Sequence, residues 1–211
     1  MVNDSKQCIT VKGYVTDIIT DYAIHFLNGR NLTQTKPFYL SVHYTSPHSP
    51  YIGSDGRADS MHPKQYVDLY NDAKFVSCPQ EPENPYAMHF HSSWCLGNRE
   101  CLKGYYAAVT AMDANIGRIM DTLKANKLDK STLVVFASDH GFNAGHHGFW
   151  GKGNAAYPLN MFETSLRIPM IWCHTGAINP GIEESVVQVL DVAPTLLEYA
   201  GNFTLSSIAS K

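Results

Sequence analysis

The feature that most constrains the fold is a long amphipathic stretch followed almost at once by a short apolar run. Between Glu100 and Lys127, apolar residues recur at the three- and four-residue spacing of one helical face, which predicts a long helix with one buried side. Residues 132–137 form a continuous apolar run, typical of a parallel strand covered on both faces. A helix followed by such a strand predicts a crossover unit, and therefore an α/β fold with a mostly parallel central sheet.

Two segments nearer the amino terminus also carry a clear local pattern. Apolar residues in 14–28 follow one helical face, which predicts a helix. Residues 38–44 are apolar, β-branched and aromatic and follow a proline, so we expect a buried strand there. The two prolines within residues 45–50 predict a loop after that strand.

The carboxy-terminal third contains two strand candidates and one helix. Residues 168–173 are predicted to form a strand. Because of Pro169, this strand should lie at the edge of a sheet or begin after the proline. Residues 186–189 are the second strand candidate. Asp191 is expected to cap a helix that has a proline in its first turn and ends at Gly201.

Residues 51–98 differ from the rest of the chain in composition. They are rich in Pro, Gly, Asn and His, which predicts a long irregular insertion with a short helix near residues 64–70. With 211 residues, 44% of them hydrophobic, the whole chain is expected to form one globular domain.

Charge and hydropathy exclude several classes of partner. Sixteen basic and nineteen acidic residues give a net charge of -3, and no basic cluster could follow a phosphate backbone, so nucleic acid is not an expected partner. No apolar run is long enough to span a membrane, and the polar residues 1–6 do not resemble a signal peptide. We therefore expect a soluble, cytoplasmic chain as given, and a secreted one if the true amino terminus lies further upstream.

The cysteines point to no metal knuckle and no redox motif. There are five, an odd number that argues against a full disulfide framework, and none forms a CxxC pair. Their positions are Cys8, Cys78, Cys95, Cys101 and Cys173.

The residues best suited to chemistry follow the predicted strand 132–137. Asp139 and His140 lie where α/β sheets bind ligands, and a carboxylate oxygen and an imidazole nitrogen can share a divalent cation. Repeated glycines in 141–153 would let the main chain turn closely around an anion, to which Lys152 would bring a positive charge. Each residue alone is more often a loop cap or a solvated side chain. Their conjunction on one loop, with a second histidine loop at His48, favours a site.

The amino-acid sequences of these segments are similar to those of the metal-dependent sulfatases of the alkaline phosphatase superfamily. Ser138-Asp139-His140-Gly141, the following Gly-x-His-Gly turn and Lys152 match one family pattern. Four more segments match the family in the same order, so the resemblance covers most of residues 14–201. These segments are Lys36-Pro37-Phe38 through Pro50, Gly104 through Arg118, Arg167 through Ile171, and Asp191 through Leu197.

The resemblance implies a fold, a reaction and a role for each matching residue. The fold would be a partial three-layer alkaline-phosphatase-like sandwich. Asp139 and His140 would be two ligands of a divalent metal, usually calcium, in a hydrolase of sulfate monoesters. His48 and Lys152 would contact the sulfate group, and one or both would stabilise the leaving oxygen. His147 would lie close to the sulfate or serve only the structure of its turn.

Two family motifs are missing from the 211 residues. The family's formylglycine nucleophile is made within a CxPSR-type motif, and its metal also binds a pair of aspartates; neither motif occurs here. We therefore expect residues 1–211 to be a truncated catalytic domain without its amino-terminal strands and carboxy-terminal subdomain, and catalytically incomplete as it stands. An amino-terminal segment outside the chain would be its partner.

Several alternatives remain open from the sequence. The substrate could be a small-molecule or carbohydrate sulfate ester, with residues 51–98 contributing to its selection. Phosphodiesterases and phosphonate hydrolases of the same superfamily would use similar metal and anion donors. A non-catalytic remnant that holds an anion or pairs with another subunit is a further reading. A zinc site around His89 and His91 is weaker, because no thiolate or carboxylate is suitably spaced.

Overall fold

The computed structural model describes residues 10–30, 36–88 and 94–201 of the chain. The chain divides into two compact units, Met1–Ile178 and Asn179–Lys211. Every residue that the sequence assigns to a site lies in the first unit. Among the described residues, no helix combines the length and apolarity needed to cross a membrane.

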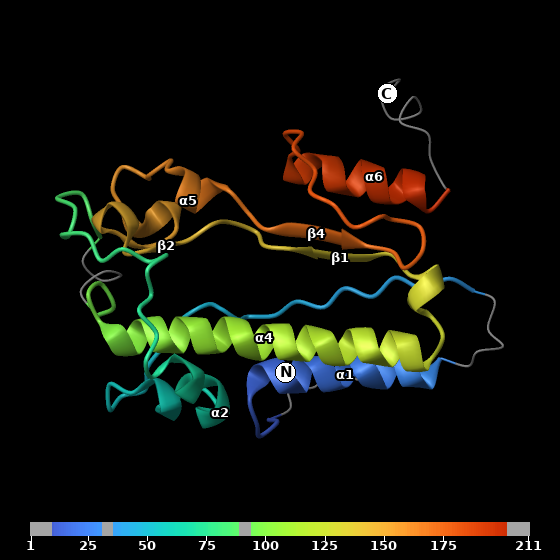
Figure 1. Cartoon of the computed structure of the whole chain (residues 1–211), viewed down its shortest axis with the longest axis horizontal. Helices are drawn as coiled ribbons and strands as arrows, with labels where there is room; N and C mark the ends of the chain where they lie inside the picture. The colour runs from blue at the N-terminus through green and yellow to red at the C-terminus, as the bar shows by residue number, and fades with distance from the viewer. Residues whose placement is uncertain (1–9, 31–35, 89–93, 202–211) are drawn as a thin grey trace. The chain divides into compact units, whose positions relative to one another are not determined.

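Two long helices form one layer of the first unit. α1 (Val15–Gly29) and α4 (Arg99–Ala125) confirm the two predicted helices and lie side by side (Figure 1). The Asn98 side chain caps α4 by accepting a hydrogen bond from the main-chain N–H of Glu100 at 2.9 Å. Asn115, only 1% exposed, joins the helices by donating to Asp17 at 2.7 Å.

The segment 38–44 is extended, but it has no strand partner among the described residues. Its side chains alternate between half-buried and exposed, as in a strand with one covered face. That face lies along α1, where Phe38 meets Phe26 edge-on at 5.9 Å and the Tyr44 hydroxyl contacts Thr20 Oγ1 at 2.7 Å. The predicted buried strand is therefore wrong in its burial and pairing, because a helix supplies side-chain contacts without a backbone ladder.

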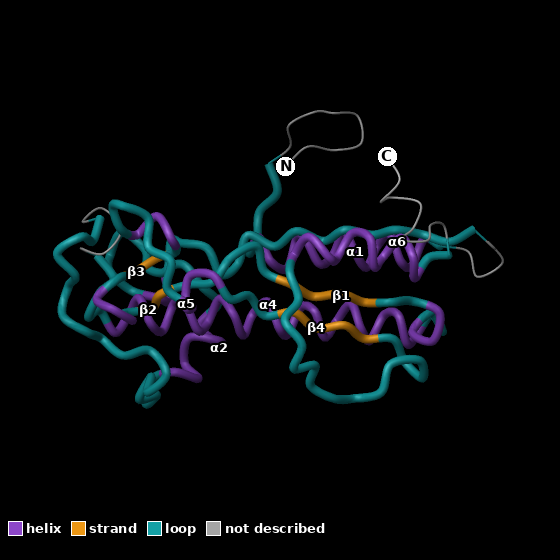
Figure 2. The backbone as a smooth tube through the Cα atoms, turned by 90° about the horizontal axis from the view of Figure 1, so that it is seen from above, coloured by secondary structure: helices purple, strands orange, loops and turns teal. Residues whose placement is uncertain are grey.

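The main strand pair runs antiparallel. β1 (Val134–Ala137) pairs with β4 (Met170–Cys173), and Figure 2 shows them side by side. The chain leaves β1, forms the loop 138–169 and returns along the same strand, so the pairing is antiparallel instead of the expected parallel. The side chains of β1 are half-buried to exposed, not covered on both faces. β4 begins directly after Pro169, as the proline predicts.

Short helical turns punctuate the described part of residues 51–98. They are η1 (Ala58–Ser60), α2 (Lys64–Val67) and η2 (Asp68–Tyr70), and the last two confirm the predicted short helix. A disulfide between Cys95 and Cys101 ties the end of the segment to the first turn of α4. The sequence did not predict this bond. Cys78 and Cys173 are free thiols, and Cys8 lies outside the described residues.

An aromatic cluster joins the start of α4 to the loop after β1. Tyr105 of α4 stacks on Phe142 with ring centroids 5.3 Å apart, and Trp150 meets Tyr51 edge-on at 5.7 Å. Tyr51 and Trp150 are 5% and 4% exposed, so this cluster is core. Burial of large aromatic rings is the strongest apolar contribution available to a loop, and it fixes the predicted site loop to the helix layer.

The second unit contains η6 (Val189–Asp191) and α6 (Val192–Tyr199). The strand predicted at 186–189 is wrong: its side chains are exposed, Val186 by 95%, and the described residues of this unit offer it no neighbouring strand. The Asp191 carboxylate accepts a hydrogen bond from the Gln188 N–H at 2.8 Å and so closes η6; it does not cap α6 as expected. Gly201 follows the helix with φ 77°, a helix end that glycine favours.

Candidate functional site

Asp139 and His140 come directly after β1, and the structure brings their side chains together. Asp139 Oδ1 lies 3.5 Å from His140 Nε2. The Asp139 side chain is 84% exposed and that of His140 is 34% exposed, so solvent reaches both. Ser138 braces the turn by donating from its hydroxyl to the His140 carbonyl at 2.8 Å.

The contact of the other nitrogen of His140 selects the tautomer of the neutral ring. His140 Nδ1 lies 2.8 Å from the Gly141 carbonyl oxygen, which can only accept. A hydrogen bond there places a proton on Nδ1, and in the neutral ring Nε2, the nitrogen that faces Asp139, then carries the lone pair. Histidines that bind metals are commonly oriented by such a bond to their second nitrogen.

The Asp139–His140 pair fits a divalent cation as two of its ligands. A carboxylate oxygen suits calcium, whereas an imidazole nitrogen is more usual with transition metals. Within residues 10–30, 36–88 and 94–201, no three His, Cys, Asp or Glu side chains group closely enough to hold a metal ion. A complete calcium shell of six to eight oxygens would therefore need further ligands.

Lys152 lies where a short hairpin ends. β2 (Asn143–Ala144) pairs with β3 (Trp150–Gly151), and η5 (Gly153–Ala155) follows Lys152. The Lys152 carbonyl accepts two hydrogen bonds, from the Ala155 N–H at 2.9 Å and from Asn160 Nδ2 at 3.1 Å. Its main chain is firmly held while its side chain is half-buried.

His147 occupies a strained position in the turn between β2 and β3. Its φ of 58° is uncommon for a residue other than glycine. The ring stacks on Phe162 with centroids 3.9 Å apart, and the main-chain carbonyl accepts from Asn84 Nδ2 at 3.2 Å. These contacts hold the ring and the main chain of the turn, and a contact of His147 with the sulfate group stays a prediction.

His48 lies exposed on the loop after the extended segment 38–44. Its N–H donates to the Thr45 carbonyl at 2.8 Å, and its Nδ1 lies 2.9 Å from the Ser49 carbonyl. Ser46 contacts Thr16 of α1 through hydroxyls 2.8 Å apart, which attaches the loop to the helix layer. Among the described residues, no hydrogen bond or ion pair links His48 to Asp139, His140 or Lys152. The joint contact of His48 and Lys152 with one sulfate group stays a prediction.

The glycines of the site loop are required for packing against other main-chain segments. A Cβ on Gly141 would lie 2.2 Å from the Thr164 carbonyl oxygen, and one on Gly148 would lie 2.1 Å from that of Pro82. Gly145, with φ 100°, would place a Cβ 2.3 Å from the Pro79 carbonyl. The structure therefore explains these three glycines without an anion, in contrast to the reason that the sequence suggested.

A buried chain of polar side chains under the loop was not predicted. Asn143 donates to Ser165 Oγ at 2.7 Å, Ser165 donates to Asn160 Oδ1 at 2.6 Å, and Thr164 donates to Asn143 Oδ1. Thr164 and Ser165 belong to α5 (Glu163–Leu166). The only sequence signal was the presence of amides and hydroxyls next to glycines and aromatics. Burial of such polar groups is tolerated only when they bond to one another.

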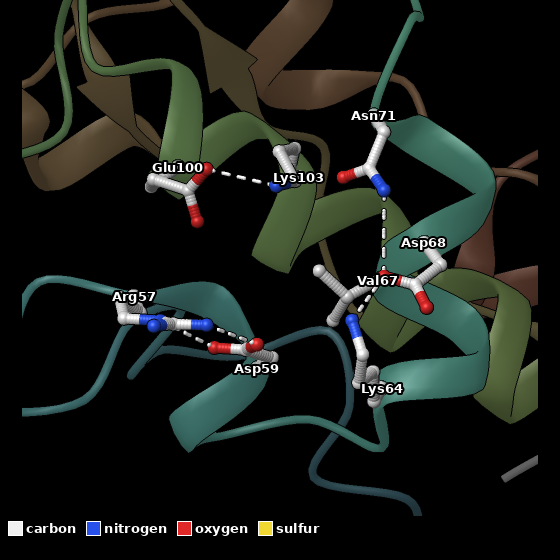
Figure 3. A pocket seen from close by; sticks show the side chains of 8 residues that line it. All are labelled: Arg57, Asp59, Lys64, Val67, Asp68, Asn71, Glu100 and Lys103. Atoms are coloured by element: carbon white, nitrogen blue, oxygen red, sulfur yellow. Dashed lines mark hydrogen bonds and ion pairs between the residues drawn. The ribbon is translucent and has the colours of Figure 1, made fainter.

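A separate cavity lies between η1, α2 and the start of α4 (Figure 3). It has a volume of about 230 Å³, and none of the residues predicted for the site lines it. Its walls carry three ion pairs, Arg57–Asp59 at 2.6 Å, Lys64–Asp68 at 2.7 Å and Lys103–Glu100 at 2.9 Å. Its charges are thus already paired with one another. His89 and His91, the zinc alternative, lie outside the described residues.

Comparison with known proteins identifies one family. The model of the Sulfatase family matches residues 1–202. The choline-sulfatase of Rhizobium meliloti is 30% identical over 79% of this chain and 32% of its own length. The N-acetylglucosamine-6-O-sulfatase of Bacteroides thetaiotaomicron is 28% identical over 92% of this chain and 44% of its own length. The chain thus spans less than half the length of these relatives.

Solved structures agree with the sequence matches. YidJ from Bacteroides fragilis superposes with a TM-score of 0.74 at 30% identity, over 93% of this chain and 39% of that one. BT4656, solved with its substrate D-glucosamine-2-N,6-O-disulfate, gives a TM-score of 0.68 at 25% identity, over 96% of this chain and 52% of that one. These likenesses confirm the expected α/β, alkaline-phosphatase-like fold.

Proposed function

The chain belongs to the sulfatase family, and from that premise we propose that it carries the metal- and anion-binding side of a site that hydrolyses sulfate monoesters. The carrying observation is the Asp139–His140 pair, 3.5 Å apart and open to solvent at the end of β1. Asp139 and His140 would hold a divalent metal, with calcium the first candidate. Lys152, which follows the β2–β3 hairpin, and His48 would contact the sulfate.

The chemistry assigned to these residues follows from the charge of the substrate. A sulfate ester is an anion, so a nucleophile approaches it only where positive charge offsets the repulsion. A bound metal would withdraw charge from a sulfate oxygen. The Lys152 ammonium would bind a second oxygen, and His48 would donate a proton or a hydrogen bond to the leaving oxygen. A small-molecule or carbohydrate sulfate ester is the proposed substrate class.

The nucleophile has no counterpart among the 211 residues. The cysteines occur in no CxPSR-type motif, and the residues present therefore do not provide a formylglycine. We propose that residues 1–211 form part of a catalytic domain whose remaining ligands and nucleophile come from outside this sequence. An in-frame CxPSR motif upstream of the Met1 codon is the expected finding in the genomic DNA.

The disulfide is evidence about the cellular compartment in which the protein resides. Cys95–Cys101 lies in the buried core, and disulfides persist mainly in oxidising compartments. We therefore favour secretion or export over the cytoplasm. Mass spectrometry of the chain isolated from its native cell under alkylating conditions is expected to find both cysteines unmodified by the alkylating reagent.

Binding and hydrolysis of a model ester test the proposed function. The purified chain is titrated with 4-nitrophenyl sulfate in the presence of calcium, and release of nitrophenol is followed by absorbance. We expect saturable binding that Lys152→Ala weakens, without release of nitrophenol. Tighter binding of 4-nitrophenyl phosphate would favour a phosphoesterase, and no binding of either ester would refute the anion site. If the parent chain released nitrophenol faster than the Lys152→Ala variant, the proposal that the site is catalytically incomplete would be refuted.

A further inference from the structure

We propose that Asn160 and Ser165 are positioning residues for Lys152 and act on it through its main chain. This inference rests on the proposed function, in which the Lys152 ammonium meets a sulfate group. Asn160 Nδ2 donates to the carbonyl oxygens of Lys152 and Gly153, both at 3.1 Å. The main-chain N–H of Asn160 donates to the same Gly153 carbonyl at 3.0 Å. Three hydrogen bonds from one residue therefore fix this peptide segment.

The orientation of the Asn160 amide is set by Ser165. A hydroxyl has a single proton, and Asn143 Nδ2, which can only donate, occupies a lone pair of Ser165 Oγ at 2.7 Å. The Ser165 proton is left for Asn160 Oδ1 at 2.6 Å. With its oxygen committed to Ser165, the Asn160 amide must turn its NH2 group towards the Lys152 carbonyl.

Because these side chains are buried, water cannot readily take the place of a lost hydrogen-bond partner. Asn143 is 0%, Ser165 3% and Asn160 8% exposed. In such surroundings hydrogen bonds strengthen, and a broken one leaves a polar group without a partner. We call the set Asn143, Asn160, Thr164 and Ser165 the amide clamp.

Lys152 is held from both directions along the chain. Before it, Gly151 of β3 lies opposite Asn143 of β2 in the hairpin register. After it, Asn160 binds the carbonyls of Lys152 and Gly153. The Lys152 ammonium can reach only positions within one side-chain length of its Cα. The anchoring of the main chain therefore limits where the ammonium can bind. Displacement of a positioning group by about 1 Å can cost a site on the order of 100-fold in rate.

Sulfate affinity of the chain tests the inference, with another buried asparagine as the matched control. Asn115 is 1% exposed and also donates two side-chain hydrogen bonds, but to Ala111 and Asp17 within the helix layer. By calorimetric titration with sodium sulfate, Asn160→Ala and Ser165→Ala are each expected to bind sulfate roughly tenfold more weakly than the parent chain. Asn115→Ala should bind sulfate with the affinity of the parent chain, even if its denaturation midpoint falls by as much as those of Asn160→Ala and Ser165→Ala.

A double variant separates positioning from a general structural loss. If Asn160 acts through Lys152, adding Asn160→Ala to Lys152→Ala leaves sulfate affinity at the level of Lys152→Ala alone. Independent losses that multiply in the double variant would overturn the inference, as would an unchanged affinity in Asn160→Ala and Ser165→Ala.

Cleavage by the lysine-specific protease Lys-C gives a readout that needs no sulfate. We expect cleavage after Lys152, measured relative to cleavage after the exposed Lys130, to rise roughly tenfold in Asn160→Ala and Ser165→Ala and to stay unchanged in Asn115→Ala. If the parent chain binds no sulfate while this ratio rises, the proposed function fails and the clamp stands. If the ratio does not rise, the clamp is refuted whatever the sulfate result.

Discussion

At the scale of single residues, His140 illustrates how a main-chain contact prepares a side chain for binding. Its Nδ1 faces the Gly141 carbonyl, and in the neutral ring Nε2, 3.5 Å from the Asp139 carboxylate, is then an acceptor. Two acceptor groups that face the same solvent-exposed point are unfavourable together unless a proton or a cation lies between them. The arrangement is therefore satisfied either by a proton on Nε2, which makes the contact an ion pair, or by a shared cation.

Removal of the Asp139 charge is predicted to weaken divalent-cation binding. With two side-chain ligands we expect calcium to bind the chain weakly, on the order of 1 mM, and Asp139→Asn to weaken it about tenfold or more. Isothermal titration with calcium chloride gives both values. Asp121→Asn removes an exposed carboxylate from α4 and is the control. Equal calcium affinities for Asp139→Asn and the parent chain would contradict the assignment.

Gly145 is predicted to tolerate no side chain, because two separate restrictions apply to it. Its φ of 100° disfavours any L residue, and a Cβ would lie 2.3 Å from the Pro79 carbonyl oxygen. Gly56 shares the positive φ, at 77°, but has nothing within 4 Å of an added Cβ. We expect Gly145→Ala to lower the free energy of unfolding by about 2 kcal/mol more than Gly56→Ala. Urea unfolding curves of the two variants measure the difference; equal losses would show that the loop can move away from Pro79.

At the scale of elements, local sequence patterns predicted the helices and strands whose formation depends on a single segment. They failed for segments whose structure depends on a neighbouring segment. α1, α4 and β4 follow from apolar spacing and from Pro169, signals that lie within each segment. The segments 38–44 and 186–189 have strand-like composition, but a strand also needs a backbone to pair with. Among the described residues, neither segment has one.

The candidate site shows the same limit. Asp139 and His140 could be paired from the sequence because they are adjacent and follow a strand. The amide clamp could not be predicted, because it joins β2, the loop residue Asn160 and α5, and no local pattern indicates which of many asparagines and serines become buried together. Cys95 and Cys101 could not be matched from an odd number of scattered cysteines.

The Cys95–Cys101 disulfide is predicted to stabilise the first turn of α4. It closes a short loop, with a sequence separation of 6. The loss of chain entropy in the unfolded state then contributes about 2 kcal/mol. Dithiothreitol should lower the free energy of unfolding of the parent chain by this amount and leave a Cys95→Ala/Cys101→Ala double variant unaffected. An equal effect of the reductant on both proteins would assign the change to another cause.

At the scale of the whole molecule, the aromatic cluster couples the site loop to the helix layer of the first unit. Phe142 and Trp150 precede and follow the turn that holds His147, and both pack against Tyr51, which the start of α4 approaches through Gly104. A Cβ on Gly104 would lie 1.9 Å from the Tyr51 carbonyl oxygen. The site loop and α4 should therefore lose their structure together on unfolding, as one cooperative unit.

This cluster also sets how stability responds to alkali. Burial raises the pKa of Tyr105 to about 12, with nearby Cys78 and Tyr106 adding to the effect. Burial likewise raises the pKa of Tyr51 well above its usual range, with Tyr105 contributing. Unfolded tyrosines ionise near pH 10, so the unfolded chain releases these protons first. The stabilisation from neutral, buried phenols is therefore complete below about pH 10 and is lost as the pH rises towards 12 and beyond.

We expect the free energy of unfolding to stay level between about pH 7 and 9 and then to fall, with Tyr105 alone accounting for about 2 kcal/mol by pH 12. Urea unfolding followed by circular dichroism at a series of pH values measures this profile. Tyr105→Phe cannot ionise and should make the alkaline decline shallower, leaving the part due to Tyr51, whereas Tyr39→Phe, at a position 83% exposed, should leave the decline unchanged. An alkaline decline as steep in Tyr105→Phe as in the parent chain would show that the cluster opens to water before the rest of the chain unfolds.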